Sequence, residues 1–211
     1  MSRDADDASL IGWEYYRRGE MEQAEQWWSR AAAENDNAAF NLAQRYLDTG
    51  RVSEASRIFR RLARQGVSDA IDRLRTVGIA QIKHNQRDGA VESLADAAEM
   101  GDADSAFNLG LLYWRHDEME AARSTWELAV QLGSPEAGTN LGALLLQAGD
   151  VRGAEEQFEL ASRRGDLDAS YNLGLLFIDQ GRRDEAARVW RAAAASGHQP
   201  AHEAFAQNGM A

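Results

Sequence analysis

The sequence predicts an all-α protein, an α-solenoid of six helix–turn–helix repeats followed by a C-terminal capping helix. Three observations predict it. Strong helix formers (alanine, leucine, glutamate and arginine) dominate a chain of 211 residues that has only 2 prolines. The string Asn-Leu-Gly-Leu begins at Asn108 and at Asn172, and Asn-Leu-Gly-Ala begins midway at Asn140. Extending this step of 32 residues in both directions gives six units with the same column requirements.

The first helix of each unit carries a column that contains only glycine or alanine. Its members are Gly12, Ala43, Gly78, Gly110, Gly142 and Gly174. Glycine inside a helix costs about 1 kcal/mol relative to alanine, so its recurrence needs a compensating reason. We expect a close approach of two helices at this column, where a large side chain would overpack.

The second helix carries an invariant alanine and, four residues later, a large apolar residue. The alanines are Ala24, Ala55, Ala90, Ala122, Ala154 and Ala186, and the large residues are Trp28, Phe59, Leu94, Trp126, Phe158 and Trp190. Residues four apart lie on one helical face, so both columns are predicted core. We expect the small residue of the first helix to face the alanine of the second.

Two further columns close the helices. One contains Gly19, Gly50, Asn85, Asp117, Gly149 and Gly181, and the other contains Asn35, Gly66, Gly101, Gly133, Gly165 and Gly197. These residue types tolerate the left-handed conformation in which helices often end. Three extra residues between Gly66 and Gly78 predict that the first helix of the third repeat starts a turn early. Residues 201–208 predict a seventh first helix that caps the array.

The sequence therefore predicts a single repeat domain over residues 1–211. The expected repeats are 5–35, 36–66, 67–101, 102–133, 134–165 and 166–197, with the cap at 198–211.

Across residues 8–208 these columns resemble the tetratricopeptide repeat superfamily, and in particular its Sel-one-like repeat branch. The string at 171–177, Tyr-Asn-Leu-Gly-Leu-Leu-Phe, is similar to the first helix of either branch. The second helix around Trp190, followed by Gly197 and Ala201, is similar to the Sel-one-like pattern. The turn between Tyr113 and Ala122 departs from that branch and has the shorter tetratricopeptide spacing. The resemblance implies a right-handed superhelix whose first helices line a concave face where ligands usually dock.

On that face we expect a binding groove through repeats two to six. An apolar stripe on the first helices supplies the anchors, and an asparagine ladder offers amides to a peptide backbone. The predicted groove residues are Phe40, Asn41, Leu47, Phe107, Asn108, Leu111, Trp114, Asn140, Leu146, Tyr171, Asn172, Leu175 and Ile178. Two alternatives stay open: the stripe could fill space between adjacent first helices, and the asparagines could bond a neighbouring helix.

Composition narrows the function classes. The chain has no cysteine, and its formal net charge of −11 argues against nucleic acid as a partner, because phosphate binding requires a positive surface. No apolar stretch suggests a membrane span or a leader, so a cytoplasmic protein is expected. Local catalytic signatures are absent, and His198 with His202 lacks a third metal ligand, so neither cofactor nor metal is expected.

The predicted function is accordingly that of a non-enzymatic scaffold or adaptor that binds a protein or peptide segment in its groove. The alternatives are a self-assembling structural protein, in which the groove pairs with another copy to form a homo-oligomer, and a regulatory subunit of an enzyme.

Overall fold

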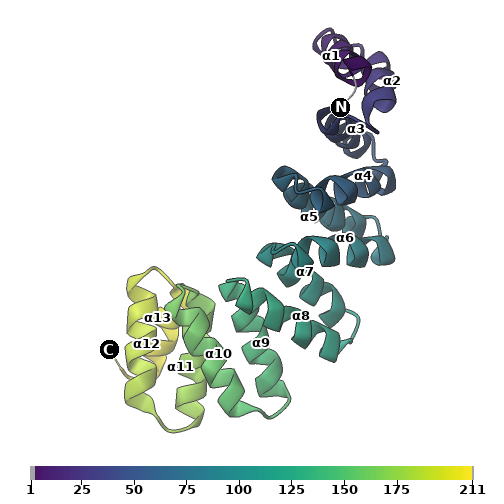
Figure 1. Cartoon of the computed structure of the whole chain (residues 1–211). Coiled ribbons are helices and arrows are strands. Elements are labelled where there is room, and N and C mark those ends of the chain that lie inside the picture. Colours follow the sequence, from purple (N-terminus) through teal and green to yellow (C-terminus); the bar gives the residue numbers. More distant parts are fainter. Residues whose placement is uncertain (1–2, 211) are drawn as a thin grey trace. The chain divides into compact units, whose positions relative to one another are not determined.

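The computed structural model describes residues 3–210, which form thirteen α-helices and no strand (Figure 1). The chain divides into two compact units, Met1–Ser105 and Ala106–Ala211. In each unit successive helices pair as hairpins, which confirms the predicted fold class: six helix–turn–helix repeats and a final helix. No helix within residues 3–210 is long and apolar enough to cross a bilayer.

The N-terminal unit contains three hairpins. Their helices are α1 (Arg3–Arg17), α2 (Met21–Ala31), α3 (Asp36–Asp48), α4 (Val52–Arg64), α5 (Ser68–Lys83) and α6 (Arg87–Glu99). As predicted, α5 is longer than the other first helices because the three extra residues extend its N-terminal end.

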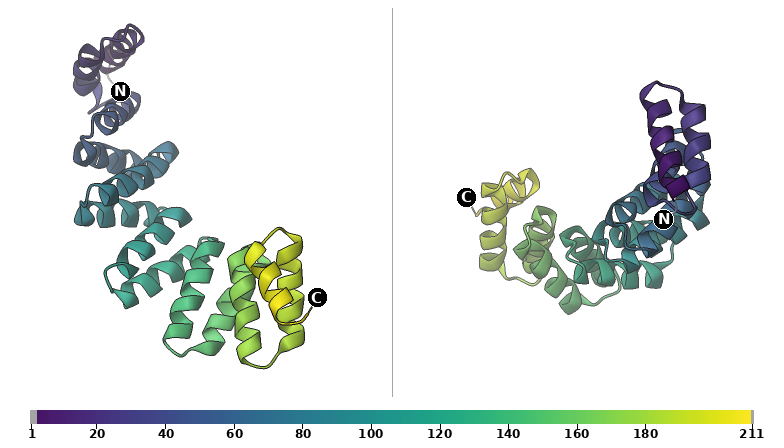
Figure 2. Two further views of the ribbon diagram at one scale, coloured as in Figure 1. Left: turned by 180° about the vertical axis from the view of Figure 1, so that it is seen from behind. Right: turned by 45° about the horizontal axis from the view of Figure 1, so that its top comes forward.

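The C-terminal unit contains three hairpins and the cap. Its helices are α7 (Ala103–Trp114), whose first turn belongs to the N-terminal unit, α8 (Met119–Gln131), α9 (Pro135–Gln147), α10 (Val151–Arg163), α11 (Leu167–Asp179), α12 (Arg183–Ala195) and α13 (Gln199–Gln207). The predicted capping helix is confirmed as α13, which packs on α12 and α11 at the end of this unit (Figure 2). Its buried residues are Ala201 and Ala204.

Eleven of the twelve predicted turn positions have positive φ, and the prediction for Asn35 was wrong. Asn35 has φ −124° and caps the start of α3, where its side chain accepts a hydrogen bond from the Ala38 amide. The other five repeats place a glycine one position before the capping residue. The connection between α2 and α3 has no such glycine, which explains why the step from Gly12 to Ala43 is one residue shorter than the 32-residue step of the later repeats.

The small-residue column is buried, but its partner differs from the predicted one. A Cβ added to Gly12 would lie 2.6 Å from the Trp28 ring, and one added to Gly142 would lie 2.6 Å from the Phe158 ring. Gly110 and Gly174 meet Trp126 and Trp190 even more closely. The glycines therefore make room for the bulky residue of the second helix rather than for its alanine. The alanine column is fully buried in all six repeats.

Two of the buried tryptophans also hold their first helix by a hydrogen bond. The Trp126 indole donates to the Phe107 carbonyl at 3.3 Å, and the Trp190 indole donates to the Tyr171 carbonyl at 3.0 Å. Each acceptor lies three residues before the glycine on which the ring rests. Because the glycine lets the indole ring lie against the backbone of the first helix, it allows both the ring packing and the hydrogen bond to the carbonyl.

Residues that cap the first helices also connect consecutive repeats. The Asp166 carboxylate accepts a hydrogen bond from the Ala169 amide and another, at 2.7 Å, from the Thr139 hydroxyl of the preceding first helix. Asn35 caps α3 and donates to Asp6 of α1 at 2.7 Å. These hydrogen bonds link the N-terminal ends of consecutive first helices. The side chains on the outward faces of these helices are therefore not needed to connect the repeats.

Candidate functional site

Large apolar side chains remain exposed on the first helices. Within residues 3–210 seven large apolar residues are exposed, and six of them lie on first helices. These six are Leu10, Trp13, Tyr16, Trp114, Leu146 and Leu175. Because an exposed apolar patch marks an interaction surface, the first-helix faces are the candidate functional surfaces of both units.

In the C-terminal unit, one depression of about 170 Å³ lies between α7 and α9. Its lining includes Leu111 and Trp114 from α7, Asn140 and Ala143 from α9, and Trp126 from below. Trp114 is 47% exposed, so nearly half of a large indole is available to a ligand. The small side chain of Ala143 leaves the space that Trp114 borders.

A second depression, of about 410 Å³, lies between α9 and α11. Leu146, Asn172 and Leu175 line it, together with Ala143 and Phe158. It shares Ala143 and Gln147 with the first depression, so the two adjoin on either side of α9. Together the two depressions form the apolar surface, which consists of Leu111, Trp114, Asn140, Ala143, Leu146, Gln147, Asn172 and Leu175.

The bulky column of the second helices forms the floor of this surface. Phe158 reaches through the gap that Gly142 leaves and contributes to the larger depression. Trp126 does the same beside Gly110 in the smaller one. The residues that hold each hairpin together thus also set the depth of the surface above them.

Three asparagines of the ladder have side chains that form no hydrogen bond within the described part of the chain. They are Asn41, Asn140 and Asn172, and all three line depressions. Asn108 has an interaction partner of its own. The alternative role of bonding a neighbouring helix therefore does not fit these three residues, whose amides are available to a ligand.

The remaining predicted groove residues lie outside the apolar surface. Phe107 and Tyr171 are half-buried, and their carbonyls are the acceptors for Trp126 and Trp190. Leu47 packs at the edge of the N-terminal core, which agrees with the alternative interpretation of the stripe as filler. Ile178 is half-buried and lines neither depression.

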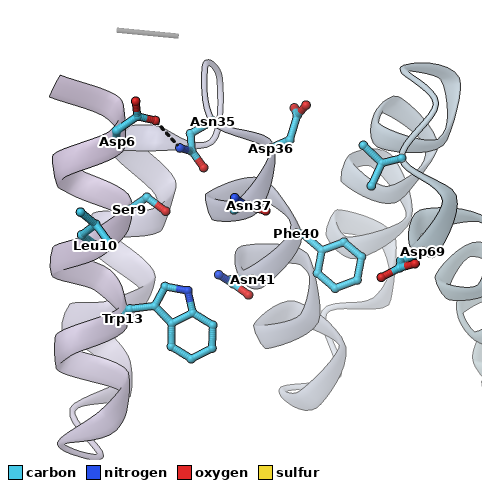
Figure 3. Close-up of a pocket in the computed structure, with 11 residues that line it drawn as sticks. Asp6, Ser9, Leu10, Trp13, Asn35, Asp36, Asn37, Phe40, Asn41 and Asp69 are labelled. Atoms are coloured by element: carbon cyan, nitrogen blue, oxygen red, sulfur yellow. Dashed lines mark hydrogen bonds between the residues drawn. The ribbon is translucent and has the colours of Figure 1, made fainter. Parts of the chain in front are cut away.

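The N-terminal unit has its own, larger pocket of about 540 Å³ (Figure 3). Trp13 from α1 and Asn41 from α3 face each other across it, while Phe40 points from α3 towards α5. The Phe40 ring also contacts the buried Phe59 ring, with centroids 5.3 Å apart, so Phe40 belongs to both core and pocket. Of the thirteen predicted residues, Phe40 and Asn41 line this pocket.

Sequence reasoning missed several residues that line these sites. Gln147 and Asp179 lie at the C-terminal ends of α9 and α11, beyond the columns that define the repeat. Asp36 and Asp69 were missed in the N-terminal pocket because acidic residues commonly occupy the first turn of a helix. Asp36 and Asp69 could have been found only from the fold, which brings them to the same pocket as the exposed Leu10 and Trp13.

Perturbed ionisable groups lie at turns rather than in these depressions. Hydrogen bonds to Glu185 and then to Glu155 raise the pKa of Arg182, and the same contact lowers the pKa of Glu185. A hydrogen bond to Glu25 raises the pKa of Arg51. Among residues 3–210 no three histidine, aspartate or glutamate side chains are grouped to hold a metal ion. His198 caps α13 and bonds Asp168.

Comparison with known families assigns the chain. Tetratricopeptide repeat models match residues 37–61, 78–137 and 139–200, and the last two segments alone cover more than half of the sequence. The chain belongs to the tetratricopeptide repeat family. A search of the curated proteins gives no match.

Solved structures share the fold at low sequence identity. PilF from Pseudomonas aeruginosa aligns with a TM-score of 0.55 and 20% identity over 97% of both chains. A Sel1 repeat protein from Oxalobacter formigenes aligns with a TM-score of 0.54 and 23% identity, over 93% of this chain and 91% of its own. YrrB, described as a TPR protein with an unusual peptide-binding site, gives 0.55 and 20% identity over 84% and 96%. The fold is thus common to tetratricopeptide and Sel1 repeat proteins.

Proposed function

We propose that this protein is an interaction module whose apolar surface in the C-terminal unit binds a segment of a partner protein. The observation that carries the proposal is the exposure of Trp114, Leu146 and Leu175 on three consecutive first helices. Tetratricopeptide repeat folds are typically non-catalytic scaffolds, and YrrB is a solved relative in fold with a peptide-binding site.

The chemistry of the surface indicates what kind of segment it takes. Its two depressions are lined mainly by leucine, alanine and aromatic side chains, and they border each other at Ala143. Such a surface favours a segment with two apolar side chains, one for each depression. Asn140 and Asn172 flank these positions and can exchange hydrogen bonds with the backbone of the segment. Their amides favour an extended peptide over a helix, because the backbone groups of a helix are already bonded.

The test uses peptides selected from a displayed random library, remade synthetically and titrated by fluorescence anisotropy. We expect Trp114→Ala to raise the dissociation constant by about 30-fold, the loss of roughly 2 kcal/mol typical of a central tryptophan. Trp114 is half-exposed, so the variant should keep the helical circular dichroism of the parent.

Val151→Ala is the matched control. Val151 is 41% exposed on α10 and lies outside both depressions, so its truncation removes exposed apolar area elsewhere. We expect unchanged affinity. Equal weakening by Trp114→Ala and Val151→Ala, or none by Trp114→Ala, would contradict the assignment of the surface.

A further inference from the structure

The pocket of the N-terminal unit differs in charge from the apolar surface. Three carboxylates line it, Asp6 from α1, Asp36 from α3 and Asp69 from α5, and its lining includes no arginine, lysine or histidine (Figure 3). Leu10, which is 65% exposed, and Trp13, which is 41% exposed, line the same pocket from α1. The pocket therefore combines exposed apolar side chains with three carboxylates.

No ion pair neutralises these carboxylates within the described chain. None of the three forms an ion pair there: Asp6 accepts a hydrogen bond from the Asn35 amide, and Asp69 accepts one from the Ser68 hydroxyl. Several other carboxylates of this unit are paired, as in Asp102 with Arg75 at 2.7 Å and Glu25 with Arg51 at 2.6 Å. The negative charge at the pocket is thus free to attract a cation.

One cation lies close by. The guanidinium of Arg73 is 5.9 Å from the Phe40 ring centroid, on the side of the phenyl group towards α5. It offsets part of the negative potential near Asp69, which precedes it by one turn of the same helix. Asp6 and Asp36 flank the opposite part of the pocket, beside Leu10, where the lining contains no basic residue.

We propose that this pocket binds a segment of a partner protein in which an apolar side chain is flanked by lysine or arginine. The apolar side chain would lie against Leu10 and Trp13, and the flanking cations would approach Asp36 and Asp69. Asn41 has an amide available at the pocket for the backbone of the segment. The inference rests on the proposed interaction role of the first helices, but it concerns a separate site with different chemistry.

The experiment uses nuclear magnetic resonance of the full-length protein and three short synthetic peptides. Their centres are Arg-Leu-Arg, Arg-Ser-Arg and Glu-Leu-Glu, with identical glycine flanks. We expect the Arg-Leu-Arg peptide to shift the Trp13 indole N–H resonance with saturation. The serine peptide should bind more weakly and the glutamate peptide should leave the resonance unmoved. A static Trp13 signal, or equal binding of the glutamate peptide, would overturn the proposal.

Charge variants locate the interaction. Asp36→Asn or Asp69→Asn should each raise the dissociation constant of the Arg-Leu-Arg peptide by up to about fivefold, the upper end of the range for an exposed charge contact. Glu136→Gln is the matched control, because Glu136 occupies the first turn of a first helix in the C-terminal unit. Glu136→Gln removes one negative charge from the first turn of a helix, as Asp36→Asn and Asp69→Asn do. Equal weakening of peptide binding by Glu136→Gln would therefore contradict the proposal.

Two further results separate this inference from its neighbours. Trp114→Ala should leave the titration of the Trp13 resonance unchanged. Binding at the apolar surface and binding at this pocket are therefore followed by different tryptophan signals, and either proposal can fail without the other. A Trp13 resonance that moves when the protein alone is diluted would identify a second copy of the chain as the occupant and would overturn the proposal.

Discussion

The two units build their first-helix faces on the same repeat but expose different chemistry. In the N-terminal unit, Leu10 and Trp13 lie among three unpaired carboxylates. In the C-terminal unit, Trp114, Leu146 and Leu175 lie among alanine and amide side chains. The columns that hold each hairpin together, by contrast, keep the same character in both units. Packing constrains one face of a first helix and leaves the opposite face free to vary.

The packing itself differs between repeats in one respect. Repeat two pairs Ala43 with Phe59, whereas repeat six pairs Gly174 with Trp190. The Trp190 indole rests on the helix backbone and donates to the Tyr171 carbonyl, whereas Phe59 packs in a repeat whose small residue carries a methyl group. An alanine in place of Gly12, Gly110, Gly142 or Gly174 would require a buried ring to move, and the contact is closest at Gly174.

The largest expected effect on stability tests this difference. Gly174→Ala should destabilise the C-terminal unit, because overpacking against Trp190 costs about 1–3 kcal/mol and exceeds the gain of about 1 kcal/mol in helix propensity. Adding Trp190→Phe recreates the pair of repeat two and should recover part of the loss. Urea denaturation followed by circular dichroism measures both variants. Greater stability of Gly174→Ala than of the parent would refute the packing argument.

The next effect concerns the bonds between repeats. Asp166→Ala removes a helix cap and the contact with Thr139, and should cost about 0.5–2 kcal/mol of the free energy of unfolding. Asp166→Asn retains an acceptor for the cap and should lose only part of this. Asn35→Ala is the corresponding variant of the N-terminal unit. If Asp166→Ala and Asp166→Asn are equally stable in thermal denaturation, the cap contributes nothing.

The smallest expected effect on stability concerns an arginine that stacks on an aromatic ring and pairs with glutamate, an arrangement found in both units. Arg51 lies over the Tyr46 ring and bonds Glu25, and Arg182 lies over the Phe177 ring and bonds Glu155 and Glu185. Since the pKa of Glu185 is lowered in the folded state, its contribution is fully present above the ordinary carboxyl range and is lost as the pH falls through the lowered value. The difference in melting temperature between the parent and Arg182→Ala should thus shrink below about pH 4. A difference independent of pH would contradict this.

Residue spacing alone was sufficient to predict the fold and much of the apolar surface. The recurring small residues inside the helices are explained by close packing, and six surface residues, including Trp114, Leu146 and Leu175, followed from the register. Leu47 was not separable from these because its column has the same apolar character whether it faces solvent or core. Asn35 misled because asparagine suits both a left-handed turn and a helix cap. The acidic pocket depends on side chains from α1, α3 and α5, and a repeat register does not show which of them lack partners.

We propose that the first-helix faces of the two units bind through different forces. Raising the ionic strength from about 0.05 M to about 0.5 M shortens the reach of exposed charges to a few ångströms and leaves apolar contacts in place. In one protein sample, the titration of Trp13 by the Arg-Leu-Arg peptide should weaken with salt, while the titration of Trp114 by a library-selected peptide should stay equal or strengthen. Identical salt dependence at the two indoles would contradict the account.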